Sequence, residues 1–288
     1  MPFYPELTPE PNDEARNMTG TISPAARLLR GFAIDFLTAH NAAAAEWVMD
    51  PGYCLSIGGH LFEGRDDSYL PATLAQLEQF PGLCVTVHDV ILGTDAMAMR
   101  FTEHGISIRQ PGRGAAWGGI TLFRTSGGRL RHGWAEEDYF ARKRQLKTSV
   151  CDAILPPQQT PWDQPVLAPD AATEAAAQRW LATPGVLLEH RQVRAICSEG
   201  PTFSQLIVPT GLTINTLFTA GNRAAFHVAC HGTYAGGFVD VDVALAGHPV
   251  TLLMAGMMTV GDDGAVSDVQ LSADRLGLHR ALLDASRT

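Results

Sequence analysis

Lysine is scarce in this sequence: of 21 basic residues only two, Lys143 and Lys147, are lysines. Both lie in one charged stretch, whereas a lysine that forms a Schiff base needs a dry pocket, so this chemistry is not expected. The net charge of −9 disfavours nucleic acids and anionic membrane surfaces as partners. Because 45% of the residues are hydrophobic and only 18% are charged, disorder along the whole chain is excluded.

Paired cysteines, long apolar runs and standard cofactor motifs are also missing. The five cysteines form no C-x-x-C pair, which argues against a disulfide scaffold or a zinc site. The most apolar stretch, 250–260, is about half as long as a membrane helix needs, and residues 1–20 contain no apolar signal-peptide core. P-loop, G-x-S-x-G and H-E-x-x-H motifs are absent. We therefore expect a cytoplasmic protein with no cofactor, no metal, no nucleic-acid partner and no membrane partner.

The sequence contains one unit twice. Residues 95–105 align with 222–232 at a constant offset of 127, and the stretch from Gly128 aligns with the stretch from Gly264 at an offset of 136. Five prolines follow the first copy within 156–169, and such a stretch forms neither a helix nor a central strand. The predicted division is an N-terminal tail over 1–22, a first domain over 23–148, a linker over 149–170 and a second domain over 171–288.

Each copy is expected to place helices before a meander of antiparallel strands. Helices are predicted over 23–45, 67–79 and 173–181. The remaining stretches alternate apolar and polar residues with period two, and glycines within 127–128 and 262–264 supply hairpin turns. Asp138 and Asp274 directly precede short terminal helices and are interpreted as N-caps. The predicted fold class is α+β, with helices packed on one face of a curved sheet.

The stretch from Thr94, TDAMAMRFTEHG, and the stretch from Gly118, GGITLFRTSGGRLRHGWAEEDYFARKRQL, resemble one known family. They are similar to the SnoaL-like polyketide cyclases of the nuclear transport factor 2-like superfamily, over most of 23–148 and more faintly over 171–283. The resemblance implies cone-shaped domains that enclose an apolar pocket. It also implies that two tandem copies form an intramolecular pseudo-dimer through their sheets, as a monomer or as a homodimer of such chains.

One strand face of the first copy combines apolar residues with acids. Between 85 and 101 most odd positions are apolar, yet Asp89, Glu103 and Glu137 share that parity. Their counterparts in the second copy are Thr216, Cys230 and Ala273. A carboxylate buried without a partner has a raised pKa, which suits general acid–base catalysis. The alternative is a β-bulge that turns one or more of these acids into solvent.

The resemblance also implies a position for a general base. In SnoaL-like cyclases the base is an aspartate directly after the tryptophan of the last long strand, but here an alanine follows Trp134. Glu137, further along on the same strand face as this alanine, is the expected base. Glu136 takes that role if the strand is bulged. Glu103 or Asp89 would stay protonated and donate a hydrogen bond to the developing oxyanion.

Aromatic residues are expected to bind the ligand. Trp117 shares the parity of the acids, and with Tyr53 and Phe123 it would form an aromatic wall, although a place in the ordinary core fits Trp117 equally well. Trp134 is expected to pack in the domain or to contact the ligand. His60, beside a glycine-rich turn, lies either at the pocket mouth or on the surface.

Three functions remain open at this point. The first is proton abstraction next to a carbonyl in the first copy, which would cyclise or isomerise an apolar carbonyl compound. The second is non-catalytic binding of a hydrophobic small molecule. The third is epoxide or ester hydrolysis, in which the same acids activate water. Because the second copy has few polar residues on its apolar face, its cavity is expected to be smaller or filled by side chains.

Overall fold

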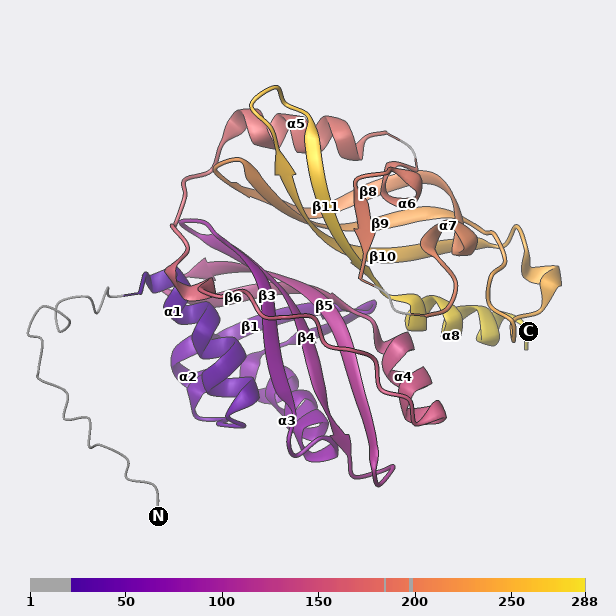
Figure 1. Cartoon of the computed structure of the whole chain (residues 1–288), viewed down its shortest axis with the longest axis horizontal. Helices are drawn as coiled ribbons and strands as arrows, with labels where there is room; N and C mark the ends of the chain where they lie inside the picture. The colour runs from indigo at the N-terminus through magenta and orange to yellow at the C-terminus, as the bar shows by residue number, and fades with distance from the viewer. Residues whose placement is uncertain (1–21, 184, 197–198, 288) are drawn as a thin grey trace, which may run out of the picture.

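The computed structural model describes residues 22–183, 185–196 and 199–287, so the predicted tail lies outside the described residues except for residue 22. The described chain forms two sheets, each with its own helices (Figure 1). The fold is α+β, as the sequence predicted. Within the described part of the chain, no helix is both long enough and apolar enough to cross a membrane.

The first sheet has six strands in the order β2-β1-β6-β5-β4-β3. These strands are β1 (Met49–Ile57), β2 (His60–Glu63), β3 (Cys84–Leu92), β4 (Ala96–Ser107), β5 (Arg113–Ser126) and β6 (Arg129–Glu137). All neighbours are antiparallel except β1 and β6, which pair in parallel. Gly127 and Gly128, both with positive φ, form the predicted turn between β5 and β6.

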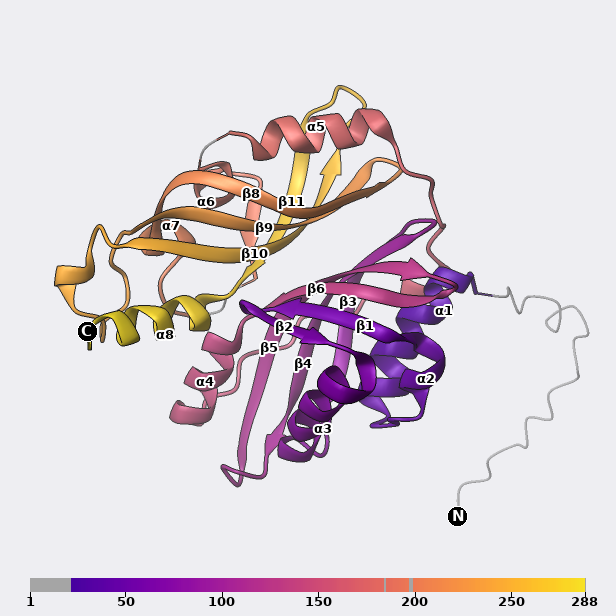
Figure 2. The same ribbon diagram turned by 180° about the vertical axis from the view of Figure 1, so that it is seen from behind.

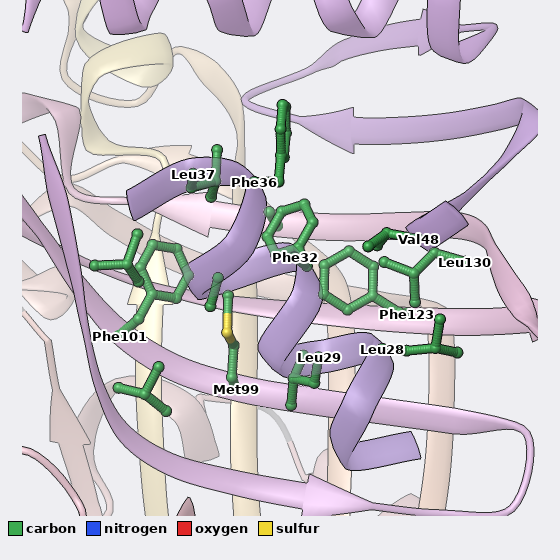
Figure 3. Close-up of a cluster of buried hydrophobic side chains, with 14 of the residues drawn as sticks. Leu28, Leu29, Phe32, Phe36, Leu37, Val48, Met99, Phe101, Phe123 and Leu130 are labelled. Atoms are coloured by element: carbon green, nitrogen blue, oxygen red, sulfur yellow. The ribbon is translucent and has the colours of Figure 1, made fainter. Parts of the chain in front are cut away.

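Helices cover the face of the first sheet that is turned away from the second sheet (Figures 1 and 2). They are α1 (Pro24–Arg30), the π-helix η2 (Gly31–Thr38), α2 (Ala44–Val48), the π-helix η3 (Arg65–Tyr69) and α3 (Leu70–Gln79), with α4 (Tyr139–Thr148) after the last strand. Phe32 of η2 packs edge-on against Phe123 of β5, with ring centroids 4.8 Å apart, inside the core that Figure 3 shows. Helical structure over 23–45 and 67–79 is thus confirmed, with a break after Thr38.

The second sheet has five strands in the order β7-β11-β10-β9-β8. They are β7 (Val193–Ala195), β8 (Ile207–Ala220), β9 (Arg223–Tyr234), β10 (Pro249–Val260) and β11 (Val266–Ala273). The helices are η4 (Pro161–Asp163) before the domain, then α5 (Ala171–Leu181), α6 (Val186–Glu189), α7 (Phe203–Leu206), η5 (Val243–Leu245) and α8 (Arg275–Ala285). In Figure 1, α5 lies on the outer side of this sheet, as the first helices do on theirs.

The two sheets pack against each other through the faces opposite their helices (Figure 2). A continuous apolar cluster joins them, made of Ile91, Ala96, Ala98, Ile120, Leu122, Phe218, Ala220, Ala225, Ala255 and Met257. Burying apolar surface from both sheets in one cluster stabilises the pairing of the domains. This is the sheet-to-sheet contact that the tandem repeat predicted.

A buried ion pair also links the two domains. Asp138 caps α4 and Asp274 caps α8, each accepting a hydrogen bond from a backbone N–H three residues on, so both N-caps are confirmed. The guanidinium of Arg275 donates to both carboxylate oxygens of Asp138, at 3.2 Å and 2.6 Å. Both side chains are almost fully buried. Asp138, which caps a helix of the first domain, therefore also binds Arg275 of the second domain.

Candidate functional site

The first domain encloses a cavity of about 130 Å³ between the helices and the covered face of its sheet. Five aromatic side chains line it: Phe32, Phe62, Tyr69, Phe101 and Tyr139. Two carboxyl groups, those of Glu103 on β4 and Glu137 on β6, also line it. An apolar cavity with a few convergent polar groups is the usual form of a small-molecule site.

Strand geometry brings the two acids together. Glu103 pairs with Trp117, and Glu137 pairs with Gly119 two residues further along β5, so both acids project from one sheet face. Glu103 and Glu137 are both buried. The indole Nε1–H of Trp117 donates to Oε2 of Glu137 at 2.9 Å. The hydroxyl of Tyr139 is also hydrogen-bonded to Glu137.

Glu103 is held by a relay from the helices. The side-chain amide of Gln76 on α3 donates to Oε2 of Glu103 at 2.8 Å. Nη1 of Arg142 on α4 donates to Oε1 of the same Gln76 at 3.1 Å. Because a guanidinium only donates, this contact orients the amide so that its NH2 group faces Glu103. The guanidinium carbon of Arg142 also lies over the rings of Tyr139 and Trp117, 4.3 Å and 5.0 Å from their centroids.

The two acids differ in their electrostatic surroundings. Burial raises the pKa of Glu103 well above its ordinary value, and the charge of Glu137 raises it further, while the charge of Arg142 and hydrogen bonds from Gln76 and Trp117 oppose the rise only in part. Burial also raises the pKa of Glu137, but hydrogen bonds from Trp117 and Tyr139 and the charge of Arg142 oppose that rise. Two carboxyl groups that share a site do not both ionise easily. The arrangement therefore favours a protonated Glu103 beside an ionised Glu137.

Asp89 does not reach this cavity, and the parity expectation for it is wrong. The register of β3 against β4 shifts between Val87 and Asp89, so a β-bulge turns the strand face at this point. Asp89 pairs with Arg100 and faces the second domain, where Arg223 donates to its two carboxylate oxygens at 2.9 Å and 2.6 Å. Asp89 therefore forms an ion pair between the two domains.

Glu136 also faces the second domain. Along the end of β6 successive side chains alternate, so Glu137 points to the cavity and Glu136 to the opposite face. Oε1 of Glu136 lies 3.0 Å from Nε2 of His227, and both side chains are buried. Burial, followed by the charge of Asp274, raises the pKa of Glu136 well above its ordinary value, and burial lowers that of His227 to about 4. The structure shows no bulge here that would exchange the two glutamates.

The expected aromatic wall is part of the core. Tyr53, Trp117 and Phe123 are fully buried, and none of them lines the cavity. Tyr53 packs edge-on against Tyr69, which does line it, at 5.0 Å between centroids. Trp117 contributes through its hydrogen bond to Glu137 instead of through contact with a ligand.

Trp134 and His60 lie away from the cavity as well. Trp134 and His132 lie on the face of β6 opposite the cavity, and their rings stack 3.8 Å apart. His60 is exposed at the start of β2, and its position brings it close enough to influence the pKa of Asp274 in the second domain. The β1–β2 hairpin therefore reaches toward the second domain with His60, and the surface alternative for this residue is the correct one.

Sequence reasoning missed Gln76, Tyr139 and Arg142. All three lie on helices, and a pattern of strand parity carries no information about which helical side chains face a sheet. One signal was present: Tyr139 directly follows the N-cap Asp138 at the end of the strand that carries Glu137. A residue in that first turn stays close to the strand end.

The second domain holds a cavity of about 190 Å³, so the expectation of a smaller or filled cavity there is wrong. It lies between α5, residues 182–183 and 185–188, and β8, and the buried Cys230 of β9 lines it. In neither domain do the described residues contain a group of three or more His, Cys, Asp or Glu side chains arranged to hold a metal ion.

Comparison with solved structures finds proteins similar to part of the chain. A candidate polyketide cyclase from Acidithiobacillus ferrooxidans is 22% identical over 46% of this chain and 100% of its own, with a TM-score of 0.40. IdmH, a candidate polyketide cyclase from Streptomyces antibioticus, is 18% identical over 43% and 99%, with a TM-score of 0.38. A candidate SnoaL-like polyketide cyclase from Jannaschia sp. CCS1 is 17% identical over 45% and 96%, with a TM-score of 0.37.

Neither a protein-family profile nor a curated protein sequence matches the chain. These three solved structures are described as polyketide cyclases, one of them as SnoaL-like, and the sequence resembles the same family. Each match covers less than half of this chain.

Proposed function

We propose that the first domain binds an apolar carbonyl compound and catalyses proton abstraction next to the carbonyl, without a cofactor. The observation that carries the proposal is a pair of buried carboxyl groups in one apolar cavity whose hydrogen bonds differ. Glu137 is the general base. Glu103 stays protonated and donates to the carbonyl oxygen as negative charge develops there.

The hydrogen bonds of the two acids support this division of roles. Trp117 and Tyr139 stabilise the charged form of Glu137, so a carboxylate is available as proton acceptor. Gln76 occupies Oε2 of Glu103, which leaves Oε1 for the acidic proton. The abstracted proton moves from the α-carbon to Glu137, and the electron pair moves into an enolate whose oxygen accepts a hydrogen bond from Glu103. Return of the proton at another carbon isomerises the compound, whereas attack of the enolate carbon on a second carbonyl closes a ring, and the resulting alkoxide takes the proton back from Glu137.

Hydrogen–deuterium exchange at the α-carbon tests the first step without knowledge of the natural substrate. Cyclic ketones with a single ring, such as 3-cyclohexenone, would be incubated with the protein in D2O, and the exchange would be followed by proton NMR. Glu137→Gln keeps the shape but removes the base, so catalysed exchange should fall by about 100-fold or more. Glu136→Gln, one residue away on the opposite strand face, is the matched control and should retain exchange.

The pH dependence provides a second readout. Exchange should rise as Glu137 ionises, above the pKa of about 4.3 of free glutamate, and fall at higher pH as Glu103 loses its proton. Glu103→Gln keeps a donor that does not titrate, so it should remove the falling limb. If no ketone in the panel exchanges faster with the protein than with Glu137→Gln, the acid–base proposal is wrong. Binding without exchange would then support the binding module, and oxygen uptake from labelled water by an epoxide or ester would support hydrolysis.

A further inference from the structure

The second cavity is lined by residues of β8 and β9 of its sheet, whereas the first is lined by residues of β1, β2, β4, β5 and β6. The repeat places Cys230 over Glu103 and Ala273 over Glu137. Cys230 lies on β9 and lines the second cavity as Glu103 on β4 lines the first. Cys230 therefore stands in the second cavity where Glu103 stands in the first, whereas Ala273, the counterpart of Glu137, does not line the second cavity.

The lining of the second cavity is apolar. Its inner wall includes Leu181, Val186, Leu187 and Cys230, all buried. A buried cysteine behaves as a small hydrophobic residue, and burial raises the pKa of this thiol, which keeps it uncharged. Gln178 and Thr183 also line the cavity, but both are exposed and so lie at its mouth. Among the described lining residues none carries a charge.

The mouth of the cavity exposes apolar surface as well. Leu212 and Ile214 project from β8 into the lining, and Ile214 is 38% exposed. Apolar surface that remains exposed beside a cavity is a common feature of a binding site. A ligand that entered from this side would cover Ile214.

We propose that the second domain has its own ligand site, which takes an uncharged hydrocarbon of about the size of one ring. An apolar cavity of about 150 Å³ in another protein stays dry and binds benzene or xenon, so a cavity of about 190 Å³ is large enough for such a group. Without an acid to hydrogen-bond a carbonyl, the site selects for apolar surface alone. It is independent of the chemistry proposed for the first domain.

Xenon under pressure would locate the site directly in crystals of the full chain. We expect a xenon atom beside Leu187 and Cys230. Xenon absent from the second domain would overturn the proposal, whether or not it occupies the first cavity.

Toluene binding in solution would test the selectivity. In methyl-labelled protein, toluene should shift the methyl signals of Leu187 and Leu212. Cys230→Asp introduces a charge and should weaken toluene binding by roughly tenfold or more, whereas Cys230→Val keeps the wall apolar and should weaken it far less. Equal toluene binding by the Cys230→Asp and Cys230→Val variants would contradict the proposed selectivity. If the Cys230→Asp variant does not fold, loss of toluene binding by the folded Cys230→Val variant would contradict the proposal instead.

Discussion

Replacing Arg275 by methionine should destabilise the protein strongly, because this residue closes a buried ion pair between the domains. Its guanidinium donates to both carboxylate oxygens of Asp138 and to the backbone carbonyls of Glu199 and Pro201. Arg275 is 1% exposed and Asp138 is 3% exposed. Removing one partner of a buried ion pair leaves an uncompensated charge and costs about 3–5 kcal/mol, and we expect the loss for Arg275→Met to lie in this range.

The pH dependence of the loss follows from the state of Asp138. Burial raises the pKa of this carboxyl even though the charge of Arg275 opposes the rise, so removal of Arg275 should raise it further. A carboxyl whose pKa is raised on folding favours the folded state below its unfolded pKa of about 3.9 and disfavours it as pH rises through the folded pKa. The deficit of Arg275→Met should therefore grow with pH.

Urea unfolding of the two proteins at several pH values between roughly 4 and 8 checks both expectations. Far-ultraviolet circular dichroism and tryptophan fluorescence should be followed together, because coincident transitions indicate that the two domains unfold as one unit. Asp138→Asn combined with Arg275→Met keeps an N-cap and removes the charge, so it should lose less stability than Arg275→Met alone. A loss below about 1 kcal/mol that does not change with pH would refute the reasoning.

Two further predictions concern β6. Glu136→Gln should raise the melting temperature relative to the unaltered protein, and the increase should be larger at pH 8 than at pH 5. Because the pKa of Glu136 is raised on folding, ionisation of this carboxyl disfavours the folded state increasingly as pH rises. A difference in melting temperature that does not change with pH would contradict this. Trp134→Ala should leave ketone exchange in the first domain within about twofold while lowering the melting temperature, since its ring stacks on His132 outside the cavity. A large loss of ketone exchange in a folded Trp134→Ala variant would indicate that Trp134 contributes to the site in the first domain.

Much of the architecture was accessible from local patterns. Alternation with period two identified the strand faces, and it correctly placed Glu103 and Glu137 on the apolar side. The repeat identified Asp138 and Asp274 as equivalent N-caps, because a cap depends only on the residues within one helical turn. The sheet-to-sheet pairing of two copies also followed from the repeat. The similarity of the chain to SnoaL-like cyclases was visible in two nearby stretches, from Thr94 and from Gly118.

The same patterns failed where a single residue or a distant helix decides the outcome. One extra residue in β3 moves Asp89 from the cavity side to the domain interface, and alternation alone does not mark where a strand bulges. A buried Tyr53 or Phe123 looks the same in sequence whether it faces a ligand or fills the core, because both environments select apolar side chains.

The sequence by itself determined the two-copy α+β plan and the strand face of the two acids, because these depend on residues close together in the chain. Only the tertiary structure decided which groups surround those acids. Gln76 of α3 donates to Glu103, Arg142 of α4 donates to Gln76, and the second domain covers Glu136 on the other face of the sheet. Such contacts join residues far apart in sequence, and they set which carboxyl holds a proton because burial and neighbouring charges control the pKa.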